Sequence, residues 1–236
     1  MTIDPAADRD ALARLAEWDT PTICNALEAI DQAWRLYGYT TRAFTCLRPQ
    51  ARPIVGYART ATIRASVKAA VPNAEAQAMR MRYYEYVAAG PRPSVVVIQD
   101  LDTRPGTGAF WGEVNTAIHH GLGALGVVTN GSIRDLEASA PGFQALAGQV
   151  GPSHAWVHVT GWAEQVEVHG MSVRDGDIVH ADCHGAVVVP ADAVARLPEA
   201  IDLIARREAV ILKAARAPDF DIDKLRAAMQ GASEIH

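Results

Sequence analysis

The sequence predicts an α/β fold in which helices cover a largely parallel sheet. Two continuous apolar runs, residues 95–98 and 125–129, are typical of strands buried on both faces. A helical segment at 112–120 lies between them, and the order strand, loop, helix, strand favours a right-handed parallel crossover. A long helical pattern at residues 191–216, closed by Pro218, completes the prediction.

The N-terminal part of the chain predicts two helices and a strand. Apolar residues recur at helical spacing over 11–16. A second helix follows, with Asp19 or Thr20 as its N-cap and Pro21 in its first turn. The loosely alternating segment at 57–63 indicates the first strand.

The remaining elements come from the same patterns of periodicity and turn residues. A helix is expected through residues 74–87 and ends before Gly90, which Pro91 follows. The C-terminal half is richer in strands, with a turn at 175–177. Strands are expected at residues 155–160, 165–169, 178–181 and 186–189.

Length and composition indicate an ordinary globular protein. We expect the 236 residues to form a single domain, 1–236, with a helical C-terminal arm at about 190–236. A net charge of -5 gives no basic surface for nucleic acid or for a membrane. The three cysteines form no CxxC pair, which favours the reducing cytoplasm, and the polar, acidic N-terminus does not resemble a signal peptide.

Candidate functional residues follow the strand at 125–129. Residues 130–132, Asn-Gly-Ser, predict a tight turn, and Arg134 and Asp135 come where a helix would begin. Ligands of open parallel sheets bind outside the carboxyl ends of the strands. Arginine suits a carboxylate or phosphate, and aspartate suits Mg²⁺ or Mn²⁺. The alternative is an ordinary capping aspartate beside a surface arginine.

The neighbouring strand end offers complementary groups. Gly112 and Glu113 open a helix, whose free amides at Val114 and Asn115 are suited to an anion. Glu113 adds a second acid near a cation, or merely complements the helix dipole. Together with Arg134, this set of groups suits a small keto acid bound beside a divalent metal.

Several separated motifs resemble the RraA-like family. The core motif comprises Gly112-Glu113 and the run GVVTNGSIRD at 126–135. Similar agreement is found in DTPT at 19–22, in the strand at 56–60 and in the segments 173–177 and 185–190. The resemblance extends over roughly residues 15 to 230 and implies a swivelling β/α/β domain. The family includes class II 4-hydroxy-4-methyl-2-oxoglutarate/4-carboxy-4-hydroxy-2-oxoadipate aldolases.

The resemblance points to the aldolase branch through one position. Aldolases of the family carry an acid twenty-one positions before the Arg of the Arg-Asp pair, where regulator-type members have glycine; here it is Glu113. The resemblance implies that Asp135 is the direct ligand of Mg²⁺ or Mn²⁺. It also implies that Glu113, together with Glu208 from a neighbouring subunit, holds metal-bound waters. Two departures are Asn130, where the family often has Asp, and Glu113 itself, where Asp is common.

The implied reaction is metal-dependent cleavage of a 4-hydroxy-2-keto acid. Arg134 and the amides after Gly112 would hold the substrate carboxylate, and the metal would draw electron density from the keto oxygen. Breaking the carbon–carbon bond would leave a pyruvate enolate stabilised by the cation and Arg134. Oxaloacetate decarboxylation passes through the same enolate and is an expected side activity. Asn115, Tyr83 and Trp111 are candidates for substrate selection.

Other interpretations remain open. The RraA proteins bind a ribonuclease without catalysis, so a non-catalytic regulator is the alternative function. The resemblance also implies homotrimers or homohexamers, with active sites at the interfaces between subunits. His180, Asp182 and His184 share a strand face and offer a possible transition-metal site, or are polar surface residues. His119 and His120 are expected at the surface. Trp111, Trp156 and Trp162 are expected to be packing or interface residues rather than a stacking platform. Gly106 and Gly108 lack a third glycine at the dinucleotide-binding spacing, so they indicate such a site only weakly.

Overall fold

The computed structural model describes residues 5–236. Six α-helices and a short 3-10 helix lie in the described part of the chain. The helices are α1 (Pro5–Leu15), α2 (Thr20–Ile30), η1 (Gln32–Arg35), α3 (Asn73–Ala88), α4 (Glu113–Gly121), α5 (Leu197–Ala215) and α6 (Ile222–Ser233). None of the helices in these residues is both long and apolar enough to cross a bilayer.

Within residues 5–236 the main sheet has nine strands, in the order β1-β6-β5-β3-β2-β10-β11, with β4 beside β5 and β7 beside β2. Strands β2, β3, β5 and β6 run parallel, and antiparallel strands lie on both sides of them. The strands are β1 (Thr45–Cys46), β2 (Ile54–Arg64), β3 (Ser94–Asp100), β4 (Ala109–Trp111), β5 (Ala124–Ile133), β6 (Gln144–Val150), β7 (His158–Trp162), β10 (Ile178–Asp182) and β11 (Gly185–Val189). A separate hairpin pairs β8 (Val166–Val168) with β9 (Met171–Val173).

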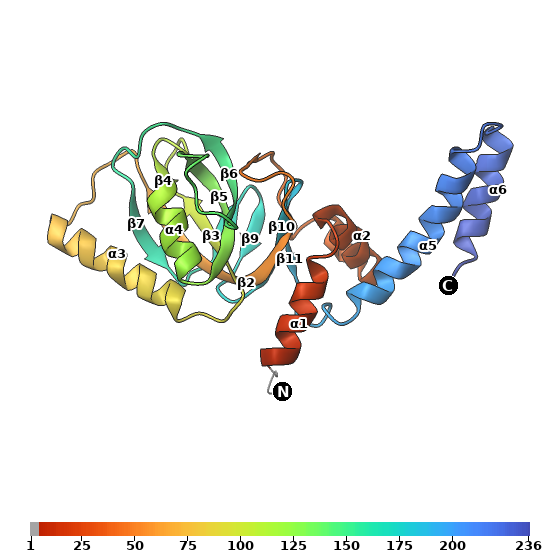
Figure 1. Ribbon diagram of the computed structural model, residues 1–236, viewed down its shortest axis with the longest axis horizontal. Helices are drawn as coiled ribbons and strands as arrows, with labels where there is room; N and C mark the ends of the chain where they lie inside the picture. The colour runs from red at the N-terminus through yellow and green to blue at the C-terminus, as the bar shows by residue number, and fades with distance from the viewer. Residues whose placement is uncertain (1–4) are drawn as a thin grey trace.

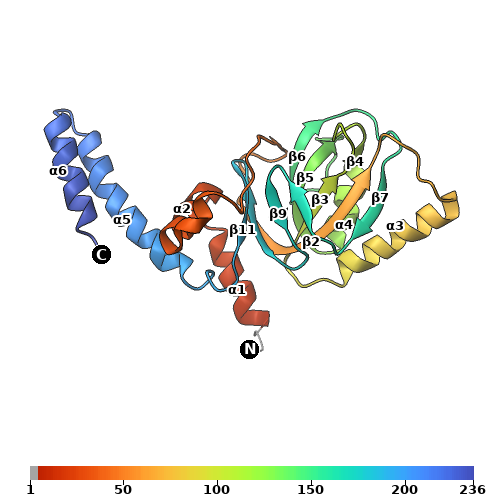
Figure 2. The same cartoon turned by 180° about the vertical axis from the view of Figure 1, so that it is seen from behind.

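The curled sheet forms a body from which the C-terminal helices project. Helices α3 and α4 cover one side of the body, whereas α1 and α2 pack beside β10 and β11 (Figure 1). Helix α5 leaves the body along α2, and α6 folds back against it, so that the two form an arm pointing away from the sheet (Figure 2). The predicted α/β class with a long C-terminal helix is therefore confirmed.

The two apolar runs are central parallel strands, as predicted, but the turn expected at residues 130–132 is wrong. Strand β5 continues to Ile133, because Ser132 pairs with Ala109 of β4 on one side and with Gln149 of β6 on the other. The Asn-Gly pair instead lies at an irregularity in the strand. The helix expected at Arg134 is also absent: residues 136–138 form a turn.

The C-terminal helix also differs from its prediction. It begins at Leu197 rather than at 191, and residues 191–196 form a turn before it. Pro198 lies in the first turn, where the missing amide costs no hydrogen bond. Helix α6, which was not predicted as a separate helix, follows Pro218 and packs against α5. The helical arm is therefore a hairpin of two helices.

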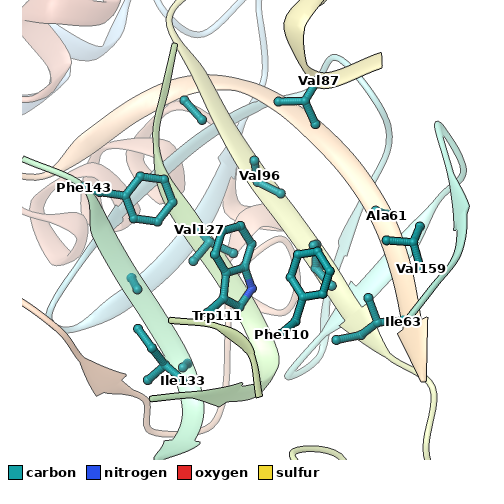
Figure 3. Packing of buried hydrophobic residues seen from close by; sticks show 14 of the residues in the cluster. Ala61, Ile63, Val87, Val96, Phe110, Trp111, Val127, Ile133, Phe143 and Val159 are labelled. Carbon is teal, nitrogen blue, oxygen red and sulfur yellow. The ribbon is translucent and has the colours of Figure 1, made fainter. Parts of the chain in front are cut away.

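The core between the sheet and α4 is built from aromatic rings. Trp111 packs in a stack on Phe143, with 5.6 Å between ring centroids, and edge-on against Phe110 (Figure 3). His119 lies among these rings and is fully buried, which overturns its expected surface position. Its Nδ1 lies 2.6 Å from the carbonyl oxygen of Asn115, and its Nε2 lies 2.8 Å from the hydroxyl of Tyr83. Both ring nitrogens are therefore hydrogen-bonded inside the core.

Burial of His119 makes stability depend on pH. Burial lowers the pKa of this imidazole from 6.5 to about 4. The unfolded chain takes up this proton below about 6.5 and the folded chain does not, so the stabilisation is complete above that pH and is lost as the pH falls towards 4. The loss attributable to His119 is about 3 kcal/mol.

Urea unfolding at pH 7.5 and pH 4.5 tests this expectation. His119→Gln should show a smaller fall in unfolding free energy between the two pH values than the wild-type chain. His120→Gln, which changes the exposed neighbour, should keep the wild-type difference. Equal pH dependence in all three proteins would contradict a proton-excluding role for His119.

Candidate functional site

The two predicted halves of the site meet where β5 ends and α4 begins. The amide of Arg134 donates to the carbonyl of Trp111, which ties the end of β5 to the residue before Gly112. Gly112 is the N-cap of α4, and its carbonyl accepts the first helical bond, from Thr116. The predicted neighbourhood of Gly112-Glu113 and Arg134-Asp135 is thus present within one chain.

Asp135 lies directly over the first turn of α4. Its Oδ2 accepts a hydrogen bond of 3.3 Å from the amide of Glu113 and lies 3.7 Å from Nε of Arg134. A Cβ on Gly112 would come within 2.7 Å of the same carboxylate oxygen, closer than atoms approach in practice. Glycine is therefore required here for the carboxylate to reach the helix end.

The backbone of Asp135 is held in an uncommon conformation. Its φ is 53°, in the left-handed region that residues other than glycine rarely occupy, although Asp and Asn tolerate it best. The hydroxyl of Ser139 donates to the carbonyl of Asp135, and the hydroxyl of Thr116 accepts from the amide of Ala140. These bonds fasten the turn after Asp135 to α4. Strained, over-determined residues of this kind cluster at functional sites.

Helix α4 and Arg134 together offer groups suited to an anion. The amides of Val114 and Asn115 precede the first intrahelical bond, so helix geometry leaves them without a helical acceptor. The side chain of Arg134 is 38% exposed. A carboxylate held between the amides and the guanidinium would be stabilised both by the helix dipole and by charge-assisted hydrogen bonds.

A groove of about 610 Å³ opens beside these groups, between α3, the start of α4 and residues 154–158. Its basic lining consists of Lys68, Arg80, Arg134, His154 and His158, with no aspartate or glutamate among the lining residues described. The lining therefore favours an anionic ligand. Asp135 and Glu113 are not among the lining residues and lie at the margin of the groove next to Arg134.

Asn115 lines the groove in a fixed orientation. Its Oδ1 accepts from the hydroxyl of Tyr84 at 2.7 Å, and its Nδ2 donates to the carbonyl of Phe110. Tyr84 therefore belongs to the groove wall, and its phenol was missed in the sequence because it approaches from α3. Tyr83 and Trp111, which were candidates for substrate selection, are fully buried and support the wall from behind.

Asn130 uses both ends of its side-chain amide to join two strands. Its Oδ1 accepts from the amide of Asp100 at 2.7 Å, and its Nδ2 donates to the carbonyl of the same residue at 3.0 Å. These two bonds join the ends of β3 and β5. Burial raises the pKa of the Asp100 carboxyl, which accepts from the amides of Asp102 and Gly106.

Asn130→Asp should destabilise the protein by about 1–3 kcal/mol, because a carboxylate cannot donate to the Asp100 carbonyl. Thermal unfolding at neutral pH measures the effect. Asn73→Asp provides the control, since Asn73 is exposed at the first turn of α3 and an added negative charge there is favourable. Equal melting temperatures for the Asn130→Asp variant and the wild type would contradict the role assigned to the amide.

Two other sets of predicted residues lie elsewhere. Glu208 is exposed on α5, where it lines a hollow with residues of α2 and η1 rather than the groove beside α4. The predicted metal site of His180, Asp182 and His184 is not formed as a set of three, because His180 is engaged elsewhere. The ring of His180 is buried and contacts the hydroxyl of Thr20 and the carbonyls of Leu15 and Trp18, whereas His184 lies in the turn after β10. Both ring nitrogens of His180 thus bind residues of α1, α2 and the turn between them, and hold these helices against the sheet.

The acids beside α4 suit a hard divalent cation. Asp135 and Glu113 provide carboxylate oxygens from adjacent backbone positions, and both residues are exposed. Mg²⁺ is commonly held by one or two carboxylates and several waters rather than by a closed protein cage. This donor set therefore fits Mg²⁺ or Mn²⁺, with Asp135 fixed by its backbone and Glu113 on a freer side chain.

A family model described as Aldolase/RraA matches residues 20–188. The chain belongs to the RraA-like family. This family includes both aldolase-type members and inhibitors of RNA processing. No curated protein sequence matches the chain.

Solved structures agree on the fold of this RraA-like protein. An uncharacterized protein from Pseudomonas syringae pv. tomato str. DC3000 is 19% identical, with a TM-score of 0.71 over 98% of this chain and 96% of that one. RraAS2 of Streptomyces coelicolor, an unusual member of the RNase ES inhibitor RraA family, is 22% identical, with a TM-score of 0.64 over 88% and 96%. The RNA-processing inhibitor RraA from Thermus thermophilis is 18% identical, with a TM-score of 0.52 over 69% and 90%.

Proposed function

We propose that this RraA-like protein is a divalent-metal-dependent lyase that cleaves a 4-hydroxy-2-keto acid and releases pyruvate. The observation that carries the proposal is the contact between the Asp135 carboxylate and the amide of Glu113, with Arg134 at its side. It joins a hard oxygen ligand, a second acid and a carboxylate-binding guanidinium at the end of a groove without acidic lining residues. Decarboxylation of oxaloacetate is proposed as a second activity of the same site.

The protein's own groups have separate roles in this proposal. Arg134 and the amides of Val114 and Asn115 bind the carboxylate of the 2-keto acid and orient it. Asp135 holds the divalent cation, which when bound would polarise the keto oxygen and stabilise the charge formed as the carbon–carbon bond breaks. Glu113 accepts the proton of the distal hydroxyl, directly or through a water.

A second subunit completes the proposed site. Glu208 belongs to α5, which projects away from the sheet (Figure 2), and it lines a hollow with residues of α2 rather than the groove beside α4, so its proposed role as an outer acid requires a neighbour. The arm exposes Leu212, Ile222 and Met229, whose exposed fractions are 43%, 65% and 57%. Exposed apolar side chains on a projecting element favour association. We therefore propose a homotrimer or homohexamer, which light scattering after size-exclusion chromatography would measure.

Pyruvate release tests the lyase proposal. The assay supplies 4-hydroxy-2-keto acids and oxaloacetate with Mg²⁺ or Mn²⁺, and EDTA should abolish the release. Arg134→Ala should raise KM by about tenfold or more because the carboxylate loses its charged partner. Wild-type activity that survives EDTA, or an Arg134→Ala variant with unchanged kinetics, would contradict the assignment.

The alternative is a non-catalytic regulator that binds a ribonuclease. Two structural relatives bear inhibitor names, at 22% and 18% identity. Inactivity across the whole substrate panel, with inhibition of a ribonuclease by the purified protein, would favour that function. The acid at position 113 is the feature that favours the enzyme.

A further inference from the structure

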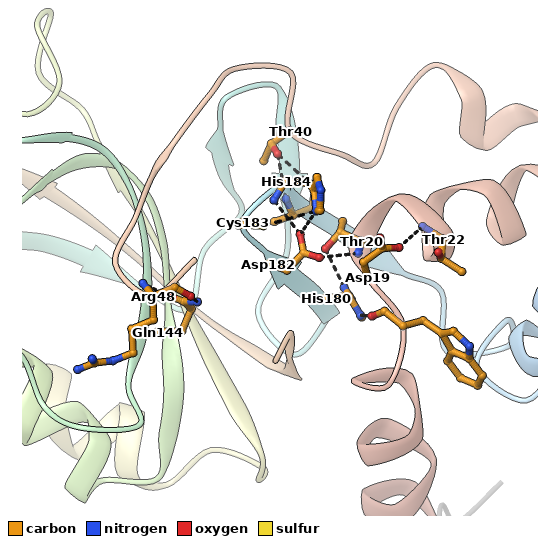
Figure 4. Close-up of polar contacts among 12 residues, drawn as sticks. Asp19, Thr20, Thr22, Thr40, Arg48, Gln144, His180, Asp182, Cys183 and His184 are labelled. Carbon is orange, nitrogen blue, oxygen red and sulfur yellow. Dashed lines mark hydrogen bonds and ion pairs between the residues drawn. The ribbon is translucent and has the colours of Figure 1, made fainter. Parts of the chain in front are cut away.

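A second cluster of metal-binding groups lies at the tip of the β10–β11 hairpin, away from α4 (Figures 1 and 4). Asp182 ends β10, and Cys183 and His184 form the turn before Gly185. One ligand atom from each of the three residues lies within 4.8 Å of the others. None of these side chains takes part in the site proposed above.

The two distances from His184 are close to those between ligands of one metal ion. Nδ1 of His184 lies 3.2 Å from Oδ1 of Asp182 and 3.7 Å from Sγ of Cys183. A tetrahedral zinc ion, with bonds of about 2.0–2.3 Å, separates its nitrogen and oxygen ligands by about 3.4 Å and its nitrogen and sulfur ligands by about 3.6 Å. His184 is therefore placed to share an ion with each of the other two residues, and all three ligand atoms lie within 4.8 Å of one another.

Asp182 gives the cluster a fixed anchor. Its side chain is 6% exposed, and its Oδ2 accepts from the amide of Thr20 at the start of α2. Its Oδ1 accepts from the amide of His184, which fixes the turn (Figure 4). Backbone donors to a ligating carboxylate orient it, as outer-shell partners do in metal sites. The hairpin is further held by Thr40, whose hydroxyl accepts from the amide of Ala186.

We propose that Asp182, Cys183 and His184 bind a zinc-type divalent cation, with water or an external group in the fourth position. The thiolate and imidazole select this class over the hard cations suited to Asp135 and Glu113, because Mg²⁺ prefers oxygen ligands. Cys183 is exposed and the side chain of His184 is 54% exposed, so the ion can enter from solvent. On binding, Cys183 coordinates as the thiolate and its Sγ proton passes to water, whereas His184 coordinates as the neutral imidazole through an unprotonated Nδ1, with its ring proton on Nε2.

Cobalt substitution tests the site with a signal that requires sulfur. The full-length protein is stripped with EDTA, kept reduced with a non-thiol reductant and titrated with Co²⁺. The wild type should bind one equivalent with a thiolate-to-cobalt charge-transfer band, and Zn²⁺ should displace it whereas excess Mg²⁺ should not. Absence of the band at saturation would overturn the proposal.

Variants separate this site from other thiols and from the proposed active site. Cys183→Ser should abolish the band, and His184→Asn should weaken Zn²⁺ binding at least tenfold. Cys46→Ser is the matched control, since Cys46 is near enough to interact electrostatically with Cys183 but is not one of the three ligands. The Cys46→Ser variant should retain the band. Asp135→Asn should also retain it. Loss of the band in the Cys46→Ser variant, or its retention in Cys183→Ser, would contradict the assigned ligands.

Discussion

Asp135→Asn is expected to lower metal-dependent pyruvate release by roughly three orders of magnitude, because it removes the charged ligand of the cation, which contributes several kcal/mol to transition-state stabilisation. Asparagine is the informative replacement. It has the same shape and tolerates the left-handed φ of 53°, so that the turn after β5 keeps its conformation. The loss should therefore appear in kcat/KM and in Mn²⁺ affinity, while the melting temperature changes little.

The control for Asp135→Asn is Glu137→Gln. Glu137 is an exposed carboxylate two residues further along, outside the site, and its neutralisation should leave activity within a factor of two of the wild type. Metal affinity is measured by titration with Mn²⁺. Full activity and unchanged Mn²⁺ binding in Asp135→Asn would show that the cation is held elsewhere.

Gly112→Ala is expected to lower activity by about a hundredfold with only a small change in stability. The added methyl would lie 2.7 Å from Oδ2 of Asp135, and the nearest atom of Arg134 is its Cγ at 3.1 Å. The carboxylate is the mobile end of an exposed side chain and can move aside, so folding tolerates the change. Catalysis does not, because the displaced oxygen no longer lies at the helix terminus.

The matched control is Gly121→Ala at the opposite end of α4. Apart from its chain neighbours and the backbone of its own helix, no atom lies within 4 Å of the position of its Cβ, so the substitution should leave both activity and melting temperature close to those of the wild type. Activity is followed as pyruvate release and stability by thermal unfolding. A large fall in melting temperature for Gly112→Ala, in proportion to its activity loss, would indicate general disruption instead of a displaced carboxylate.

The elements predicted from the sequence are those whose signal is local. The apolar runs at 95–98 and 125–129 became β3 and β5, and Asp19 accepts from the amide of Thr22 as the N-cap of α2. Strand β6 was missed because its sequence, QALAGQV, has few β-branched residues and gains its strand conformation from pairing with β5.

Errors arose where distant partners decide the outcome. Asn130-Gly131 has the composition of a turn, but pairing with β4 and β6 keeps it in a strand. The burial of His119 depends on Tyr83, which approaches from another helix. For the candidate site, the position of the strand ends predicted that Gly112-Glu113 and Arg134-Asp135 lie together. The hydrogen bond that joins them, from the amide of Glu113 to the carboxylate of Asp135, could not be predicted from the sequence.

The contact at the start of α4 has an evolutionary consequence. Position 113 meets Asp135 through its backbone amide, whereas its side chain is exposed and makes no hydrogen bond or ion pair in the described part of the chain. An exchange at such a surface position changes stability by only a few tenths of a kcal/mol, about 0.5 at most. A lineage with this scaffold can therefore gain or lose an acid at position 113, and with it a chemistry, without passing through an unfolded intermediate.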